Sequence, residues 1–319
     1  MVLIPPVFRI GELGIQPGYI GNNVAVIIDG RSNIGNTVAI MEESAAPIDH
    51  GYPDSRFVTV DGLRVHYRRN GTGPSILLLH GSGSSLESWD RVAATLSESG
   101  DVIRPDLPGF GRTGPRRDRD YAVGKYAETL AKFLDALGIA SVTVVGNSLG
   151  GNIGWNFALD FPQRVDRLVL INSTGYPDKS LPLAFRLARS RVGRVILRRL
   201  ISRSATERNL RTLVGANQEI VDDAMVDRVY GMMRRPGNQQ AFIDFANIDQ
   251  VDRTAELSKI RAPTLVLRSA SIDGQHFARD IRGSRELLHP DGGHLLPEED
   301  PQWVADAVRR FISHTQEPQ

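Results

Sequence analysis

From residue 56 onward, the chain alternates between short apolar runs and longer segments with apolar residues at helical spacing. The runs contain few polar positions, which is typical of parallel strands buried on both faces. They lie at 75–81, 101–106, 142–145, 166–172 and 264–267, with a shorter run near 284–288. Between two of them, 121–137 carries apolar residues at helical spacing and stops at Gly138. This alternation predicts an α/β fold with a mostly parallel sheet covered by helices on both sides.

Both ends of this region carry local signals. "RFVTVDGLRVHYRRNGTG" reads as a β-hairpin that turns at Asp61-Gly62, because an Asp-Gly pair suits a tight hairpin turn. At the other end, Asp300 and Pro301 have the residue types of an N-cap and a first helical position, so they predict a final helix.

The strand pattern disappears between Tyr176 and about Lys259, where the chain reads as helical. We interpret 176–259 as a helical cap inserted into a core made of 56–175 and 260–319. The first half of this cap is rich in arginine. A solvated face is the ordinary interpretation, and a surface that attracts an anionic substrate or membrane headgroups is the alternative.

Residues 1–55 have a different character. Two apolar runs separated by turn formers suggest a β-hairpin, and several prolines make the remainder an irregular arm. We expect this arm to pack on the core or to form a dimer contact, and a role in covering the active site is the alternative. The first residues lack the charged and apolar regions of a signal peptide, which favours a cytoplasmic protein.

Composition excludes several kinds of chemistry. The 319 residues contain no cysteine, so thiol nucleophiles, disulfides and thiolate metal sites are excluded. The net charge of +1 gives no reason to expect a nucleic acid partner. No apolar run approaches the roughly 20 residues of a membrane span. A small-molecule substrate is the expected partner, with a homodimer as a further possibility that the arm suggests.

The stretch "GNSLGG" at 146–151 fits the pattern G-x-S-x-G, directly after a buried strand and before a helical segment. A serine at such an elbow adopts a strained backbone, and glycines at Gly146 and Gly150 avoid clashes beside it. We therefore predict that Ser148 is a nucleophile, with Asn147 as a neighbouring support residue.

A second loop, "HGSGSS", follows the strand at 75–79. Small residues such as Gly81 allow backbone amides to point into a site. The amides of Ser82 and Leu149 would then form a two-donor oxyanion hole. We interpret His80 as a structural hydrogen-bonding residue.

A serine nucleophile requires a base. His294 lies in "PDGGHLLPEEDP", a Gly-Gly loop between the last strand and the last helix, where a loop can bring an imidazole over the carboxyl edge of the sheet. We predict that His294 is the general base and acid. The other six histidines lack such a loop signature.

Together, these loops resemble those of the α/β-hydrolase family, over roughly residues 56–314. The resemblance implies an eight-stranded sheet, a helical cap, and a Ser–acid–His triad that acts without metal or organic cofactor. Relatives usually carry Trp-Gly-x-x-Asp after the penultimate strand, whereas this chain has Arg268-Ser269 and then Ile272 in the acid position. Asp273, one residue later, is the predicted acid.

Three functions are compatible with these residues. The first is a serine hydrolase that cleaves a carboxylic ester, a lactone or a related acyl bond through an acyl-enzyme. The second is a carbon–carbon bond hydrolase of the meta-cleavage-product type, which "HGSG" and Asn147-Ser148 resemble, although Leu295 stands where those enzymes usually have tryptophan. The third is a hydrolase-fold protein whose altered acid loop serves ligand binding or a non-hydrolytic reaction.

Overall fold

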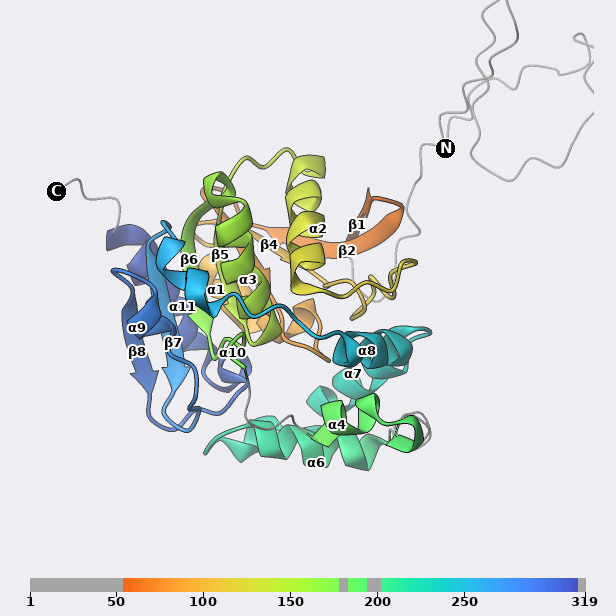
Figure 1. Ribbon diagram of the computed structural model, residues 1–319. Helices are drawn as coiled ribbons and strands as arrows, with labels where there is room; N and C mark the ends of the chain where they lie inside the picture. The colour runs from red at the N-terminus through yellow and green to blue at the C-terminus, as the bar shows by residue number, and fades with distance from the viewer. Residues whose placement is uncertain (1–53, 178–182, 194–201, 315–319) are drawn as a thin grey trace, which may run out of the picture. The chain divides into compact units, whose positions relative to one another are not determined.

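The computed structural model describes residues 54–177, 183–193 and 202–314 (Figure 1). The arm expected at 1–55 lies outside these described residues except for its last two positions.

The core is one eight-stranded sheet with the strand order β1-β2-β4-β3-β5-β6-β7-β8. The strands are β1 (Arg56–Val60), β2 (Leu63–Asn70), β3 (Ser75–Leu79), β4 (Asp101–Pro105), β5 (Val142–Asn147), β6 (Val165–Ile171), β7 (Thr264–Ser269) and β8 (Arg285–His289). Strand β2 pairs antiparallel with β1 and β4, and every other pair is parallel. The predicted mostly parallel sheet is therefore confirmed.

The predicted hairpin is also present between β1 and β2. Asp61 has φ 49° and Gly62 has φ 75°, so both turn residues lie in the left-handed region that a tight hairpin turn requires. This turn closes the antiparallel end of the sheet.

Helices cover both faces of the sheet. Those outside the cap are η2 (Leu86–Trp89), α1 (Asp90–Leu96), α2 (Val123–Ala136), α3 (Leu149–Asp160), η3 (Pro162–Arg164), α9 (Phe277–Asp280), α10 (Leu296–Glu299) and α11 (Pro301–His314). Alternate residues of one strand enter different cores: Leu77 and Leu79 pack with α2 and α3, whereas Ile76 and Leu78 pack with α1 and α11. A strand buried on both faces needs apolar residues at every position, which explains the continuous apolar runs.

The last helix begins as its residue types predict. The Asp300 carboxylate accepts a hydrogen bond from the Trp303 amide at 3.0 Å, and Pro301 is the first residue of α11. The cap oxygen thus satisfies an amide that has no partner within the helix.

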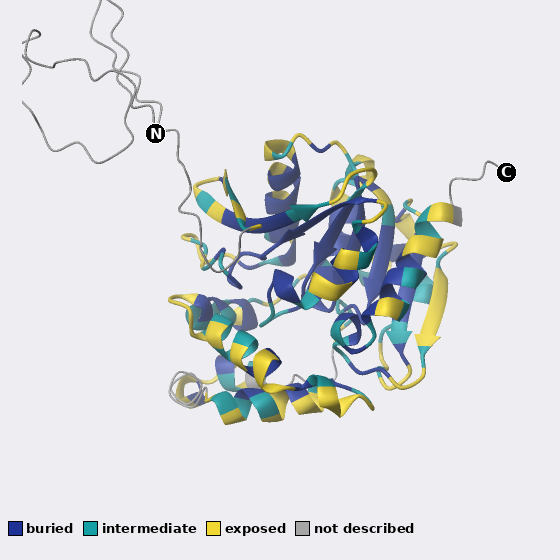
Figure 2. Ribbon diagram, turned by 180° about the vertical axis from the view of Figure 1, so that it is seen from behind, coloured by how far each residue is buried: buried dark blue, intermediate teal, exposed yellow. Residues whose placement is uncertain are grey.

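The outer edge of the sheet differs from its centre. Figure 2 shows the central strands as buried and β8 as exposed, and Leu287 and Leu288 of β8 are 40% and 50% exposed. The connection between β7 and β8 contains only the single turn of α9 in its helical part, so little helix covers this edge.

The helices between β6 and β7 form a group of their own. They are α4 (Leu183–Arg189), α6 (Arg203–Leu213), η4 (Gln218–Ile220), α7 (Asp223–Arg234), α8 (Asn238–Asn247) and η5 (Thr254–Lys259). In Figure 1, α4, α6, α7 and α8 lie together to one side of the sheet. A small apolar cluster joins α6 to α7 through Leu210 and Met225. We refer to the helices α4 to α8 as the cap.

Arginines of the cap pair with acids at the surface. Arg203 contacts both Asp223 and Asp227, and Arg211 contacts Glu207 one helical turn before it. These pairs are solvent-exposed and fit the interpretation of a solvated face. Of the other arginines in the basic run, Arg194, Arg198 and Arg199 lie outside the described residues.

No helix in the described ranges is both long and apolar enough to cross a membrane.

Candidate active site

Ser148 occupies the sharp turn between β5 and α3, with φ 55° and ψ −116°. A Cβ on Gly146 would lie 2.3 Å from the carbonyl oxygen of Gly150, and one on Gly150 would lie 2.1 Å from the carbonyl oxygen of Leu79. Only glycine fits at these two positions. The Ser148 amide donates to the Ile171 carbonyl at 3.0 Å, which fixes the turn to β6. The strained backbone of a nucleophile elbow is therefore enforced by its surroundings.

The loop after β3 lies against this elbow. A Cβ on Gly81 would be 3.3 Å from the Cβ of Ser148, which is a close contact. The amides of Ser82 and Leu149 donate to no acceptor in the described part of the chain. Leu149 is also the first residue of α3, where the helix carries a positive partial charge. Both amides are thus available to a ligand at the elbow.

His80 is fully buried beside this loop. Its Nδ1 donates to the Gly81 carbonyl at 2.8 Å, and its Nε2 accepts from the Leu107 amide at 2.9 Å. Burial lowers the pKa of His80, while the charge of Asp106 opposes that shift. A neutral imidazole with both nitrogens bonded to backbone is a structural residue, as its sequence position suggested.

The His294 loop reaches the same edge of the sheet. The side-chain amide of Asn147 donates to the His294 carbonyl at 3.2 Å, so this loop is directly bonded to the residue before Ser148. Burial lowers the pKa of the His294 imidazole. Its ring nitrogens make no hydrogen bond within the described residues. The neutral form that a general base needs is therefore favoured.

Asp273 lies apart from this group. Its side chain is exposed, and its carboxylate accepts from the Gly274 amide at 2.7 Å. In the described part of the chain it makes no hydrogen bond or ion pair with the His294 ring. Nearby, Ser271 donates to the Gly292 carbonyl at 2.9 Å, so the two loops do meet. The role of Asp273 stays a prediction.

Two groups that the sequence did not single out contact the His294 loop. Glu299 is 8% exposed and accepts hydrogen bonds from the amides of Gly293 and Leu295. Asn172, at φ 41° after β6, donates to the Gly293 carbonyl at 2.9 Å. The sequence signal that could have indicated such partners is the Gly-Gly-His loop itself, because the amides and carbonyls of a buried loop need hydrogen-bond partners.

A different serine, histidine and aspartate are linked by hydrogen bonds outside this site. Ser55 Oγ lies 2.9 Å from His66 Nε2, and His66 Nδ1 donates to Asp106 at 2.7 Å. Burial favours a raised pKa for Asp106, but its bonds and charge interactions with His66 hold that pKa below the usual value. The same carboxylate accepts from the amides of Leu86 and Arg112. It ties together three segments of the core, which is the function of a structural anchor.

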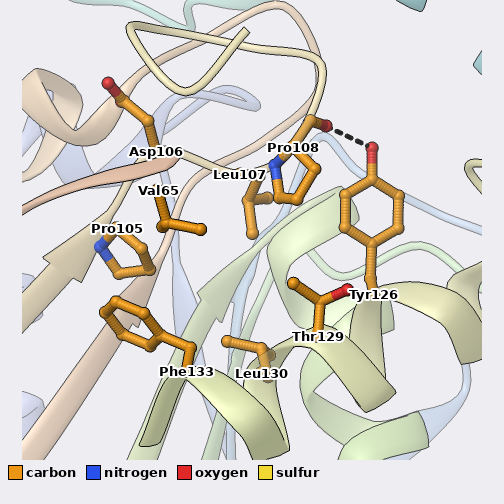
Figure 3. A pocket seen from close by; sticks show the side chains of 9 residues that line it. All are labelled: Val65, Pro105, Asp106, Leu107, Pro108, Tyr126, Thr129, Leu130 and Phe133. Atoms are coloured by element: carbon orange, nitrogen blue, oxygen red, sulfur yellow. Dashed lines mark hydrogen bonds between the residues drawn. The ribbon is translucent and has the colours of Figure 1, made fainter. Parts of the chain in front are cut away.

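A small cavity lies between β2, the loop after β4 and α2 (Figure 3). Its walls are mainly apolar, and the Tyr126 hydroxyl at its rim donates to the Pro108 carbonyl at 2.8 Å. Neither Ser148 nor His294 lines it. We regard it as a packing gap in the core.

No group of three histidines, aspartates or glutamates within the described ranges could hold a metal ion.

Comparisons with known proteins agree with this architecture. The family model described as the alpha/beta hydrolase fold matches residues 74–301. An uncharacterized protein of Mycobacterium tuberculosis is 43% identical over 285 residues, covering 83% of this chain and 82% of that protein. A 2-hydroxy-6-oxo-2,4-heptadienoate hydrolase of Pseudomonas putida is 30% identical over 250 residues, covering 76% of this chain and 81% of that enzyme.

Solved structures extend the likeness. The crystal structure of the enol-lactonase from Burkholderia xenovorans superposes with a TM-score of 0.70 at 22% identity, covering 81% of this chain and 100% of that one. At this identity the likeness concerns the fold alone. The family match, by contrast, spans most of the chain and includes the elbow, both flanking loops and the final strand. The chain therefore belongs to the α/β-hydrolase family.

Proposed function

We propose that this protein is a serine hydrolase that cleaves a carboxylic ester, a lactone or a related acyl bond through an acyl-enzyme. The observation that carries the proposal is the elbow itself. Ser148 has a strained backbone at the start of α3, two amides beside it are free to bind an oxyanion, and Asn147 bonds to the His294 loop.

The steps follow from these positions. His294 takes the proton of Ser148 Oγ as that oxygen attacks the acyl carbon, and the amides of Ser82 and Leu149 bind the oxyanion that forms. His294 then protonates the leaving alkoxide as the carbon–oxygen bond breaks. A water molecule, deprotonated by His294, then attacks the acyl-enzyme. His294 returns that proton to Ser148 Oγ as the bond between this oxygen and the acyl carbon breaks, and the acid is released.

Asp273 is the proposed third member of the triad. Its exposed carboxylate can orient His294 only if the loop after β7 rearranges when substrate binds. If it does so, Asp273→Asn lowers kcat by about 10⁴-fold, because the imidazole loses its correct tautomer. A rate close to wild type for Asp273→Asn removes this residue from the mechanism.

Carbon–carbon bond hydrolysis is the second candidate. The 30% identical Pseudomonas putida relative, which is named a 2-hydroxy-6-oxo-2,4-heptadienoate hydrolase, favours it. Leu295 argues against it, since enzymes of that type usually carry tryptophan after the histidine. A yellow dienol substrate that bleaches on mixing with the protein would favour this candidate over ester hydrolysis.

Short-chain and long-chain p-nitrophenyl esters test the proposal. We expect turnover by wild type and a loss of about 10⁶-fold in kcat for Ser148→Ala. Ser313→Ala, which changes an exposed serine on α11, is the matched control and should retain full activity. A fluorophosphonate probe should label wild type and Ser313→Ala but not Ser148→Ala. If the probe leaves wild type unlabelled, the hydrolase proposal is wrong and a binding or non-hydrolytic role takes its place.

A further inference from the structure

The carbonyl groups of the His294 loop are bonded to core side chains. The Gly293 carbonyl accepts from Asn172 at 2.9 Å and from the Ser269 hydroxyl at 2.7 Å. The next carbonyl, that of His294, accepts from Asn147. Asn172 and Ser269 are buried, and they also bond to each other. The ends of β5, β6 and β7 therefore hold this side of the loop.

The amide groups of the loop converge on one carboxylate. Both oxygens of Glu299 accept from the Gly293 amide, at 3.0 and 2.9 Å, and Oε1 also accepts from the Leu295 amide at 3.1 Å. These two amides stand on either side of His294. Charge-assisted bonds of this kind are stronger than bonds between neutral groups. Glu299 thus grips the backbone on both sides of the predicted base.

The same carboxylate bonds to the cap. The Gly215 amide donates to Glu299 Oε2 at 2.7 Å, and the His294 amide donates to the Leu213 carbonyl at 2.6 Å. A Cβ on Gly293 would lie 2.3 Å from the Gly215 nitrogen, so the two backbones touch. Leu295 also packs against the apolar cluster of α6 and α7. Cap residues 213–216 and the His294 loop are therefore joined at the backbone.

The backbone of the His294 loop is thus held by hydrogen bonds, whereas the imidazole ring of His294 has no hydrogen-bond partner in the described part of the chain. The position of the ring is consequently set by the loop that carries it. We propose that Glu299 is a positioning residue, which clamps the His294 loop and cap residues 213–216 into one unit and so aims the base at Ser148. Its catalytic part rests on the proposed function, while the clamp itself is a property of the fold.

Glu299→Gln is the direct test. Glutamine has nearly the same shape, but its amide nitrogen is a donor and cannot accept from the amides of the loop. We expect kcat for a p-nitrophenyl ester to fall by about 10- to 100-fold, since displacing a catalytic group by about 1 Å can cost two orders of magnitude. KM should change far less, because substrate contacts are retained. The rate of fluorophosphonate labelling of Ser148 should fall with kcat, since labelling needs the same serine and base.

Asp306→Asn is the matched control. Asp306 lies on α11, and its carboxylate pairs with Arg309 at the surface rather than with the loop amides. We expect its kcat and labelling rate to stay close to wild type. Glu299→Asp supplies a second variant that keeps the charge but is one methylene too short to reach every amide, and it should lose activity as well.

Amide hydrogen exchange of the peptide covering 291–295 gives a measurement that is independent of activity. The clamp predicts faster exchange there in Glu299→Gln and Glu299→Asp and unchanged exchange in Asp306→Asn. Unchanged exchange in the Glu299 variants overturns the clamp. Faster exchange with an unchanged kcat overturns the positioning role. If wild type neither turns over esters nor takes the label, the proposed function fails, while exchange still decides whether Glu299 holds the loop.

Discussion

Individual residues of this protein are determined by what their immediate neighbours allow. Gly111 is an example: its φ is 50°, and a Cβ there would lie 2.1 to 2.3 Å from the atoms of the Asp106 carboxyl group. Asp106 in turn anchors His66 and the loop after β4. A substitution that adds a single carbon atom at Gly111 can therefore disturb several segments at once.

Gly111→Ala should destabilise the protein by about 2–4 kcal/mol, since it combines a left-handed backbone with a clash against a buried carboxylate. Gly83→Ala is the control, because Gly83 has φ 74° with nothing within 4 Å of the added Cβ. It should cost only the backbone strain, about 1–2 kcal/mol. Urea denaturation compares the two free energies of unfolding, and equal losses would contradict the role given to Asp106.

The pH dependence of activity reports on His294. Burial lowers its pKa from the usual 6.5, and only the neutral imidazole can act as a base. Activity should therefore persist to a lower pH than an exposed histidine would allow, and fall as the pH drops through the lowered pKa. We expect the acid limb of kcat/KM to have its midpoint below 6.5. His276→Ala, at an exposed histidine, should leave that limb unchanged, and a wild-type midpoint above 6.5 would contradict burial of the base.

At the scale of elements, local sequence signals and packing agree closely. The continuous apolar runs became two-sided strands, and the Asp-Gly pair became the hairpin turn. Cap helices follow the same local rules. The Asp222 carboxylate accepts from the Met225 amide at 2.8 Å and begins α7.

Asp222→Ala should lower the free energy of unfolding by about 1 kcal/mol, because an amide in the first turn of α7 loses its acceptor. Asp222→Asn keeps a capping oxygen and should lie within a few tenths of a kcal/mol of wild type. Thermal or urea unfolding distinguishes the two variants. If alanine and asparagine behaved alike, the cap bond would contribute nothing measurable.

At the scale of the whole described molecule, the cap is bonded to the core at the His294 loop. Besides the backbone bonds of cap residues 213–216, Arg228 of α7 pairs with Glu298 of α10, and both side chains are largely buried. Burial raises the pKa of Glu298, while Arg228 lowers it. Removing Arg228 would leave a buried carboxylate without its partner.

Arg228→Met should destabilise the protein by about 3 kcal/mol near neutral pH, in the range found when a buried pair loses one member. The raised pKa means that folded Glu298 binds its proton more readily than the unfolded chain does. The loss of stability caused by the unpaired Glu298 carboxylate therefore disappears at low pH. It grows as the pH rises through the pKa of Glu298 in the folded protein. Urea unfolding at acid and neutral pH should show a larger loss of unfolding free energy, relative to wild type, at neutral pH. The double variant that carries both Arg228→Met and Glu298→Met should recover most of this loss. A loss that does not depend on pH would contradict the pairing.

Some residues of the candidate site can be predicted from local sequence patterns, and others cannot. Ser148, with glycines two positions before and after it, follows a buried strand, and the structure places it at a strained turn. The prediction of His294 as the base rests on its Gly-Gly loop after the last strand, and it stays a prediction. No local pattern marks the acid as clearly, because its position depends on how the loop after β7 folds.

The sequence by itself determined the order and type of the elements, the parallel sheet and the serine at the elbow. It could do so because the spacing of apolar residues, the turn residues and the spacing of glycines are patterns among residues close together in the chain. Only the tertiary structure decided that Glu299, Asn172 and Ser269 meet at the His294 loop. Those residues come from distant segments, and no local pattern marks them. Their bonds exist because a buried loop must satisfy its own amides and carbonyls wherever the fold supplies partners.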